Sequence, residues 1–173
     1  FNPVRYMRLL ELVAGEHTSQ QSLETVAAFG AQVLGKGIVY GKDTPNFIAN
    51  RIGTYAIGSV FRHMETLGLT VEEADAIVGR PMGIPKTGIF GLMDLTGIDL
   101  GPHVVGSMLK LLPKDDALCK FVDPGSALNR LITRMIAEGS TGRKGKGGFY
   151  RLIRDGGEKR KEAIDLTTGD FKT

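Results

Sequence analysis

The fold is decided first by residues 1–13, FNPVRYMRLLELV, which end in a short apolar run that carries one acid, Glu11. Alternation along a strand would place Met7, Leu9, Glu11 and Val13 on one face and the residues between them on the other. A carboxylate among apolar neighbours is costly unless it has a partner or a chemical role. The pattern therefore predicts a strand whose Glu11 belongs either to a sheet edge or structural ion pair, or to a functional site.

Capping residues and apolar spacing predict that helices dominate the rest of the chain. The sequence first predicts a helix from a Thr18–Gln21 capping box to Gly35 or Gly37, followed by a strand at 37–40. A long helix comes next, with Thr44 as N-cap and Pro45 as first residue, and ends near 67–68. A short helix from a Thr70–Glu73 capping box to 78 and helices over about 104–112 and 127–138 complete the prediction. Residues 79–88 are rich in Gly and Pro and are predicted to form a loop.

The tail from residue 151 has a different pattern. It predicts a β-hairpin with a Gly-rich turn at 155–157, followed by another turn at 167–170. The alternative for this segment is a basic, disordered end.

The composition is that of an ordinary globular chain of 173 residues, 42% of them hydrophobic and 24% charged. No apolar run approaches the roughly 20 residues that a membrane span needs. The single cysteine, Cys119, excludes an internal disulfide framework and favours a reducing compartment such as the cytoplasm. The net charge of +3 suits an acidic ligand only weakly, and it is too small and scattered to suggest nucleic-acid binding.

The predicted long helix carries a second polar candidate, Asn50. At helical spacing it shares a face with Phe47, Thr54, Gly58 and Phe61. A Gly inside a helix costs about 1 kcal/mol relative to Ala, so Gly58 indicates close approach by another segment or a ligand. The alternative for Asn50 is an amide that caps or packs a helix, because buried polar groups usually serve as satisfied hydrogen-bonding groups.

Two kinds of site are not indicated by the sequence. There is no Gly-x-Gly-x-x-Gly after a strand, so the turn that cradles the phosphates of a dinucleotide is not encoded in these residues. The histidines, His17, His63 and His103, lack the spacing of paired metal ligands, so no metal site is expected.

Four ordered motifs, which together cover residues 1–150, resemble the 3-hydroxyacyl-CoA dehydrogenase family. They are FNP at 1–3 with Glu11, DTPNFIANRI at 43–52, GRPMG at 79–83 followed by FGLMDLTGID at 90–99, and GRKGKGGFY at 142–150. Two departures stand out: Asn46 occupies a position where the family usually has Gly, and residues 84–88 form an insertion typical of longer multifunctional relatives.

The resemblance implies roles for three residues. Glu11 matches the family acid that orients and supports the catalytic histidine, which would lie two residues before Phe1 and outside this sequence. Asn50 matches the family residue that hydrogen-bonds the substrate. Lys144 matches a lysine that reaches NAD in some relatives, and the alternative for Lys144 is a solvated basic turn.

The same resemblance implies a fold and a domain organisation. The expected fold is mainly α: a helical C-terminal domain of the 6-phosphogluconate-dehydrogenase-like type, preceded by a strand–helix–strand remnant of a Rossmann domain. Residues 1–43 would be the truncated C-terminal edge of the NAD-binding domain, 44–150 the helical substrate and dimerisation domain, and 151–173 a hairpin-like extension or linker. The extension suggests a parent protein with further domains.

The function implied is that of a fragment of an NAD-dependent enzyme of fatty-acid β-oxidation, which oxidises 3-hydroxyacyl-CoA to 3-oxoacyl-CoA. An acyl-CoA substrate and a homodimer formed through the helical domain follow from the resemblance, and the fragment alone is expected to be inactive. The alternative is a non-catalytic helical module for oligomerisation or CoA-ester binding. A superfamily member acting on a small hydroxyacid fits less well, because such relatives do not combine the Phe-Asn-Pro and Pro-Met-Gly patterns.

Overall fold

The computed structural model describes residues 1, 3–155 and 158–172. The chain forms two compact units, an N-terminal unit, Phe1–Gly53, and a C-terminal unit, Thr54–Thr173. Within the described residues, no helix has the length and apolar character needed to cross a membrane.

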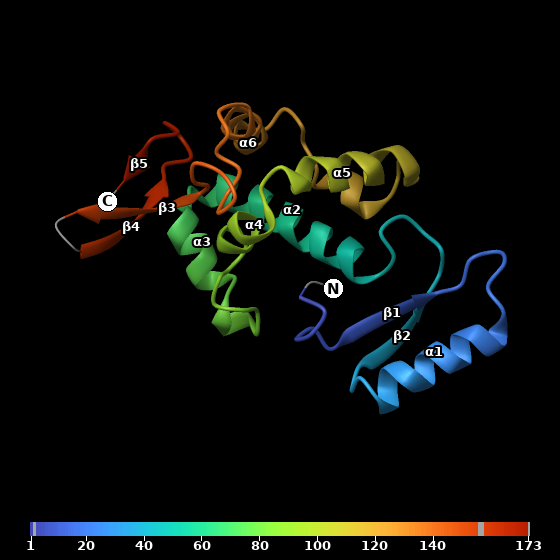
Figure 1. The fold of residues 1–173 in the computed structure, drawn as a ribbon. Coiled ribbons are helices and arrows are strands. Elements are labelled where there is room, and N and C mark those ends of the chain that lie inside the picture. Colours follow the sequence, from blue (N-terminus) through green and yellow to red (C-terminus); the bar gives the residue numbers. More distant parts are fainter. Residues whose placement is uncertain (2, 156–157, 173) are drawn as a thin grey trace. The chain divides into compact units, whose positions relative to one another are not determined.

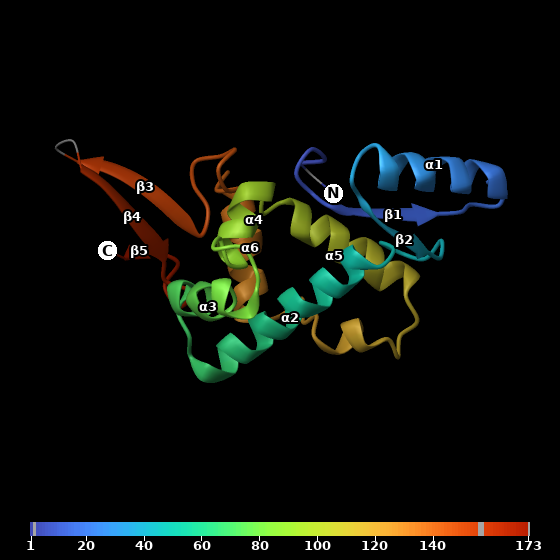
Figure 2. The same cartoon turned by 90° about the horizontal axis from the view of Figure 1, so that it is seen from below.

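The N-terminal unit is a strand–helix–strand arrangement, as the sequence predicts. Strand β1 (Leu9–Val13) pairs in parallel with β2 (Gly37–Gly41), and the connecting helix α1 (Gln20–Gln32) lies alongside both strands (Figures 1 and 2). A Cβ atom on the buried Gly30 of α1 would lie only 2.9 Å from Leu10 Cδ2 and 3.0 Å from Ile38 Cδ1. Glycine at this position therefore lets the helix pack closely on the strands.

The predicted ends of α1 are wrong by a few residues. The N-cap is Ser19, whose hydroxyl accepts a hydrogen bond from the Ser22 amide at 3.1 Å. Thr18, the predicted cap, instead accepts from the Gly15 amide at 3.0 Å and so belongs to the preceding turn. The helix ends at Gln32, with Val33 as its C-cap, before either predicted glycine.

The long helix α2 (Ala49–Leu67) ends where the sequence predicts but begins later than the Thr44-Pro45 signal indicates. The carbonyl of Thr44 accepts from the Phe47 amide at 3.0 Å and closes a turn instead of capping a helix. Asn46 and Phe47 have φ angles of 58° and 54°, which a right-handed helix cannot include.

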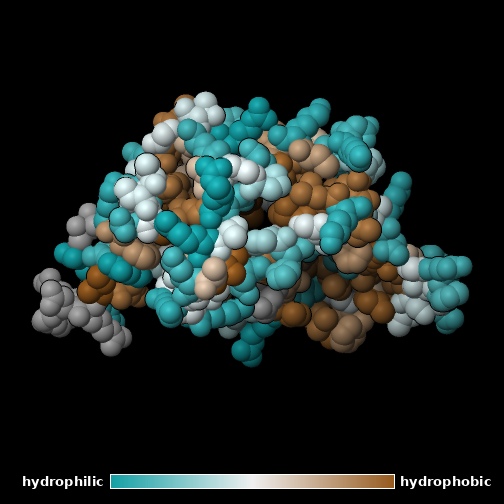
Figure 3. Space-filling model, turned by 90° about the horizontal axis from the view of Figure 1, so that it is seen from above, coloured by the Kyte–Doolittle hydropathy of each residue, from teal (hydrophilic) through white to brown (hydrophobic). Residues whose placement is uncertain are grey.

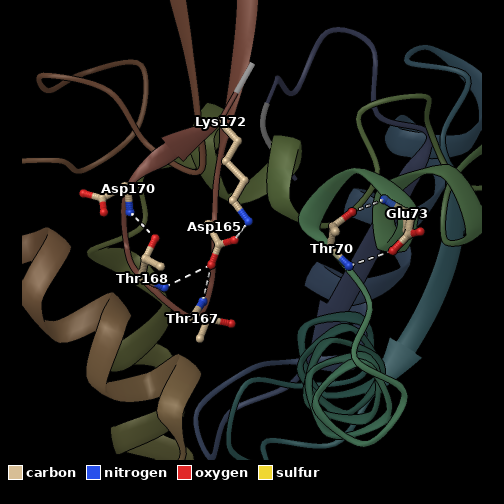
Figure 4. Close-up of polar contacts among 7 residues, drawn as sticks. All are labelled: Thr70, Glu73, Asp165, Thr167, Thr168, Asp170 and Lys172. Atoms are coloured by element: carbon tan, nitrogen blue, oxygen red, sulfur yellow. Dashed lines mark hydrogen bonds and ion pairs between the residues drawn. The ribbon is translucent and has the colours of Figure 1, made fainter.

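The C-terminal unit contains most of the helical structure. It begins with residues 54–67 of α2. These are followed, before the tail, by α3 (Val71–Ile77), the 3-10 turn η1 (Arg80–Met82), α4 (Phe90–Thr96), α5 (Leu100–Leu111), the 3-10 turn η2 (Ala117–Lys120) and α6 (Ala127–Ala137). The predicted Thr70–Glu73 capping box is confirmed: the Thr70 amide donates to Glu73 Oε2 at 2.9 Å, and the Glu73 amide donates to Thr70 Oγ1 at 3.2 Å (Figure 4).

The core of this unit is centred on aromatic side chains from distant parts of the chain. Phe90 and Phe149 are fully buried, with ring centroids 4.7 Å apart in an edge-to-face arrangement, and Phe61 stacks on Phe90 at 5.6 Å. Around them pack buried apolar residues from α2, α3, α6, β4 and the segment between α4 and α5: Met64, Val71, Ala74, Ile98, Leu128, Leu131, Ile132, Met135 and Ile164. Phe149, near the C-terminal end of the sequence motif at 142–150, is therefore part of the core.

The tail folds as a sheet over its described residues. Strands β3 (Tyr150–Asp155), β4 (Glu158–Ile164) and β5 (Phe171–Lys172) are antiparallel in the order β3-β4-β5. The hairpin is confirmed, whereas residues 156–157 of its predicted turn lie outside the described residues, and the pattern did not predict β5.

The turn predicted at 167–170 is also present, organised by an acid just before it. One carboxylate oxygen of Asp165 accepts from the amides of Thr167 and Thr168, at 2.7 and 3.0 Å, and the other forms an ion pair with Lys172 (Figure 4).

Glu162 on β4 is enclosed between two arginines. It is 5% exposed, and its carboxylate oxygens lie 2.8 Å from nitrogens of Arg151 and of Arg160. Hydrogen bonding by Arg151, reinforced by Arg160, lowers the pKa of Glu162 below its ordinary value of 4.5.

We expect this pair of arginines to make stability depend on pH. Because the pKa of Glu162 is lower in the folded than in the unfolded protein, its ionised form stabilises the fold. This contribution is complete above the unfolded-state pKa and is lost as pH falls through the folded-state pKa. The difference in Tm between the wild type and Glu162→Gln should therefore be widest near neutral pH and should narrow below about pH 4. Glu138→Gln, at an exposed acid, is the matched control. A difference that stays constant from pH 7 to pH 3 would contradict this account.

Candidate functional site

Glu11 lies on β1 and is half-buried, as the strand pattern predicts. Its Oε1 atom accepts a hydrogen bond from the backbone amide of Ala49 at 2.6 Å. Ala49 is the first residue of α2, where amides have no partner inside the helix and the helix dipole favours a negative charge. The sequence left open a structural ion pair for Glu11, and the structure gives it the beginning of a helix as its partner.

Asn50 follows Ala49 and so lies in the first turn of α2, one residue beyond the amide that Glu11 binds. It is exposed, which is compatible with contact to a ligand. The predicted helical face is only partly correct: Thr54, Gly58 and Phe61 are helical with Asn50, but Phe47 precedes the helix.

The turn before Asn50 has an uncommon backbone conformation. Asn46 and Phe47 both lie in the left-handed region, with φ angles of 58° and 54°. Asn is among the non-glycine residues that adopt this region most readily, whereas a bulky residue such as Phe is an outlier there. The family that the sequence resembles usually has Gly at the position of Asn46, and a positive φ angle is the backbone feature that Gly accommodates best.

A comparison of Ala and Gly at position 46 should reveal this conformation. Both variants remove the Asn side chain, but only Ala places a Cβ in the left-handed region. Asn46→Ala should therefore be less stable than Asn46→Gly by about 1 kcal/mol, as measured by chemical denaturation. The same pair at the exposed Asp43 is the control, where Gly should be no more stable than Ala. Equal stability of the two variants at position 46 would contradict the assigned backbone.

Lys144 belongs to the C-terminal unit and is exposed. Its Nζ donates to the carbonyl of Thr96, the last residue of α4, at 2.9 Å. A lysine in this position satisfies a helix C-terminal carbonyl and interacts favourably with the helix dipole. The structure thus places Glu11 against the amide of Ala49, the residue before Asn50, in the N-terminal unit, and it gives Lys144 a helix end as its partner in the C-terminal unit.

Asp94 on α4 organises the glycine-rich segment 142–150, and the sequence analysis did not single it out. It is 5% exposed, and its Oδ1 and Oδ2 atoms accept from the Phe149 and Tyr150 amides at 2.8 and 2.9 Å. A Cβ on Gly148 would lie 1.9 Å from Asp94 Oδ1, and a Cβ on Gly142 would lie 2.4 Å from the Asp94 carbonyl oxygen. Burial raises the pKa of Asp94, and the two amide hydrogen bonds act in the opposite direction.

Asp75 on α3 has a similar structural role. Its carboxylate accepts from the amides of Phe90 and Gly91 at the start of α4, at 2.8 and 3.0 Å, and from the Tyr150 hydroxyl at 2.9 Å. Burial, followed by the charge and hydrogen bond of Asp75, raises the pKa of Tyr150, so the hydroxyl remains a donor at neutral pH. Neither acid is marked by local pattern, because the partners of each lie at least 15 residues away.

A pocket of about 290 Å³ lies beside this cluster in the C-terminal unit and is lined by Glu72, Asp75, Ala76, Lys86, Thr87, Tyr150, Lys161 and Ala163. Its charges are balanced, with two acids and two lysines, and Lys161 Nζ lies 3.4 Å from the centroid of the Tyr150 ring. This balance favours neither an anionic nor a cationic ligand. Within the described ranges, no group of three or more His, Cys, Asp and Glu residues is placed to hold a metal ion.

Two family models match the chain. Residues 47–152 match the C-terminal domain of 3-hydroxyacyl-CoA dehydrogenase, and residues 1–44 match the NAD-binding domain of the same enzyme.

Individual relatives agree with this match. The chain is 41% identical over 166 residues to a fatty acid oxidation complex trifunctional enzyme of Rickettsia felis, covering 96% of the chain and 22% of the relative. It is 36% identical over 167 residues to a 3-hydroxyacyl-CoA dehydrogenase of Deinococcus radiodurans, covering 96% of the chain and 45% of the relative. The chain thus spans less than half the length of these relatives.

Among solved structures, the chain resembles FadB2 of M. tuberculosis with a TM-score of 0.72 and 29% identity. The similarity covers 88% of this chain and 50% of that one. The likeness therefore extends through most of the elements described above.

Proposed function

Because the chain belongs to the 3-hydroxyacyl-CoA dehydrogenase family, we propose that it is part of an enzyme of fatty-acid β-oxidation that oxidises 3-hydroxyacyl-CoA to 3-oxoacyl-CoA. The observation that supports the proposal is the hydrogen bond from the Ala49 amide to Glu11, since it ties Glu11 to the residue that precedes Asn50. Glu11 and Asn50 are the two residues whose family counterparts support the catalytic base and hold the substrate.

In the proposed mechanism, Glu11 acts through a histidine, and Asn50 acts on the substrate oxygen. A histidine supplied by the parent protein ahead of Phe1 takes the proton of the substrate hydroxyl. Glu11 orients the imidazole of that histidine and stabilises its charged form, as carboxylates do in catalytic triads. Asn50 positions the substrate oxygen by hydrogen bonding.

NAD is the cofactor that we propose for the parent enzyme. The parallel β1–α1–β2 arrangement fits the edge of a dinucleotide-binding fold, although the phosphate-cradling turn is not encoded in residues 1–173. When bound, NAD supplies the hydride acceptor. Lys144 is the residue of this chain that we propose to contact NAD, and its exposure supports this role.

We further propose the domain limits 1–43, 44–150 and 151–173, with homodimerisation through the helical domain. Several large apolar side chains of the C-terminal unit are 47–67% exposed: Leu67, Ile77, Leu95, Leu100 and Leu111. Apolar surface also appears among the polar residues in Figure 3. Burial of such side chains in a partner would favour association. The single cysteine supports a reducing compartment, for which we propose the cytoplasm.

The experiment for the proposed function uses the full-length parent protein. We expect NADH to form from NAD and 3-hydroxybutyryl-CoA, with far lower activity on free 3-hydroxybutyrate. Binding of the CoA ester without NADH formation would overturn the proposal in favour of a non-catalytic CoA-ester module. A preference for the free hydroxyacid would overturn the substrate class.

A further inference from the structure

We propose that Glu11 is a positioning residue for Asn50: its carboxylate, by holding the Ala49 amide, fixes the first turn of α2, which carries Asn50. This proposal rests on the proposed function, in which Asn50 contacts the substrate. It adds to the family role of Glu11 a second one, in which a side-chain oxygen accepts the hydrogen bond of the Ala49 amide.

The first step is the origin of the cap. Helices usually begin with a polar residue whose side chain accepts from an amide of the first turn. Ile48, which precedes α2, has no oxygen in its side chain, and Thr44 is used in the preceding turn. The acceptor for Ala49 is instead Glu11, 38 residues earlier in the chain. The start of α2 is therefore tied directly to strand β1.

The second step is that this start needs support. The left-handed backbone at Asn46 and Phe47 costs on the order of 1–2 kcal/mol per residue. Such conformations persist only where surrounding contacts determine them, and they are common near functional sites. Without the bond to Glu11, relaxation of this turn would move the residues that follow it.

The third step is packing on the other strand. The position of a Cβ built on Gly41, at the end of β2, is 3.5 Å from Ile48 Cδ1 and 3.4 Å from Val13 Cγ2. Ile48 therefore lies against the end of β2, and the start of α2 has both this hydrophobic contact and the hydrogen bond to Glu11. The hydrogen bond is the directional contact of the two, and it holds the residue next to Asn50.

Two substitutions separate the roles of Glu11. Gln keeps an oxygen that can accept from the Ala49 amide but has no charge, whereas Met fits the apolar neighbours and offers only a weak sulfur acceptor. Loss of the charge should lower kcat in both variants. Loss of the acceptor is expected only in Glu11→Met. There it should weaken substrate binding and reduce the protection of the Ala49 amide from hydrogen exchange.

The experiment uses the full-length protein with Glu11→Gln, Glu11→Met and, as control, Glu16→Ala in the exposed loop after β1. Hydrogen exchange of peptides that contain Ala49 should be about tenfold faster in Glu11→Met, as expected for loss of one charge-assisted hydrogen bond. It should be about threefold faster in Glu11→Gln, which keeps a neutral acceptor, and within about twofold of wild type in the control. Similar exchange in the Met and Gln variants, or unchanged exchange in Glu11→Met, would overturn the proposal.

Kinetics provide the second measurement. KM for 3-hydroxybutyryl-CoA should rise about fivefold to tenfold in Glu11→Met and remain near the wild-type value in Glu11→Gln. In the double variant, Glu11→Met should add no rise in KM to that of Asn50→Ala alone. Additive effects of the two substitutions would overturn the positioning role. A wild-type protein that forms no NADH would instead refute the proposed function, while the exchange experiment would still test the bond between Glu11 and α2.

Discussion

Replacing Glu11 with Gln should reduce the kcat of the full-length protein for 3-hydroxybutyryl-CoA by roughly 100-fold or more, since groups that orient a catalytic histidine act on this scale. Glutamine has nearly the same shape as Glu and retains an acceptor for the Ala49 amide, so the start of α2 should stay in place. The loss should therefore appear in kcat, with KM nearly unchanged.

The measurement is steady-state NADH formation, with circular dichroism to check that the variant is folded. Asp43→Asn, at an exposed carboxylate before α2, provides a matched control and should retain wild-type turnover. If Glu11→Gln turned over at the wild-type rate, Glu11 would be a structural cap of α2 only.

The largest loss of stability is expected for Gly148→Ala. The new Cβ would lie 1.9 Å from Asp94 Oδ1, so the buried carboxylate would have to leave the amides of Phe149 and Tyr150. Overpacking and the loss of these hydrogen bonds should together lower the free energy of unfolding by about 3 kcal/mol or more. Thermal unfolding should show a decrease in Tm of about 6–12 °C.

Gly106→Ala on α5 is the control for this substitution, because a Cβ there would meet nothing within 4 Å. Its higher helix propensity should leave stability unchanged or raise it by up to about 1 kcal/mol. In an Asp94→Ala background, Gly148→Ala should have a much smaller effect than in the wild type. An equal effect in both backgrounds would contradict the role assigned to Asp94.

Much of the fold could be predicted because its signals are local. The Thr70–Glu73 capping box is encoded within four consecutive residues and appears as predicted. The end of α2 and the β3–β4 hairpin were also marked by glycines near the element ends. For the same reason, the sequence correctly predicted a strand–helix–strand segment followed by helices.

The errors arise where distant residues decide the local structure. Thr44-Pro45 has the pattern of a helix start, but the left-handed backbone at Asn46 and Phe47 and the bond from Ala49 to Glu11 delay α2 to Ala49. Asp94 lies within a motif of the family that the sequence resembles, but local pattern assigned it no structural role, because the two amides it binds lie 55 and 56 residues later in the chain.

The candidate site was likewise predictable only where its signals are local. A carboxylate within an apolar strand marks Glu11 from local pattern, and Asn50 is marked by motif resemblance. Spacing could not predict that Glu11 binds the amide of Ala49, the residue before Asn50, because this bond depends on how the segment before α2 turns.

The most direct test of the account is the rate of NAD reduction by the full-length protein with 3-hydroxybutyryl-CoA, measured for the wild type and Asn50→Ala side by side. The account predicts steady NADH formation by the wild type and a decrease in kcat/KM of at least about tenfold in Asn50→Ala, as expected for the loss of one hydrogen bond to the reacting oxygen. A wild-type protein that binds the CoA ester but forms no NADH, or an Asn50→Ala variant with wild-type kcat/KM, would contradict it.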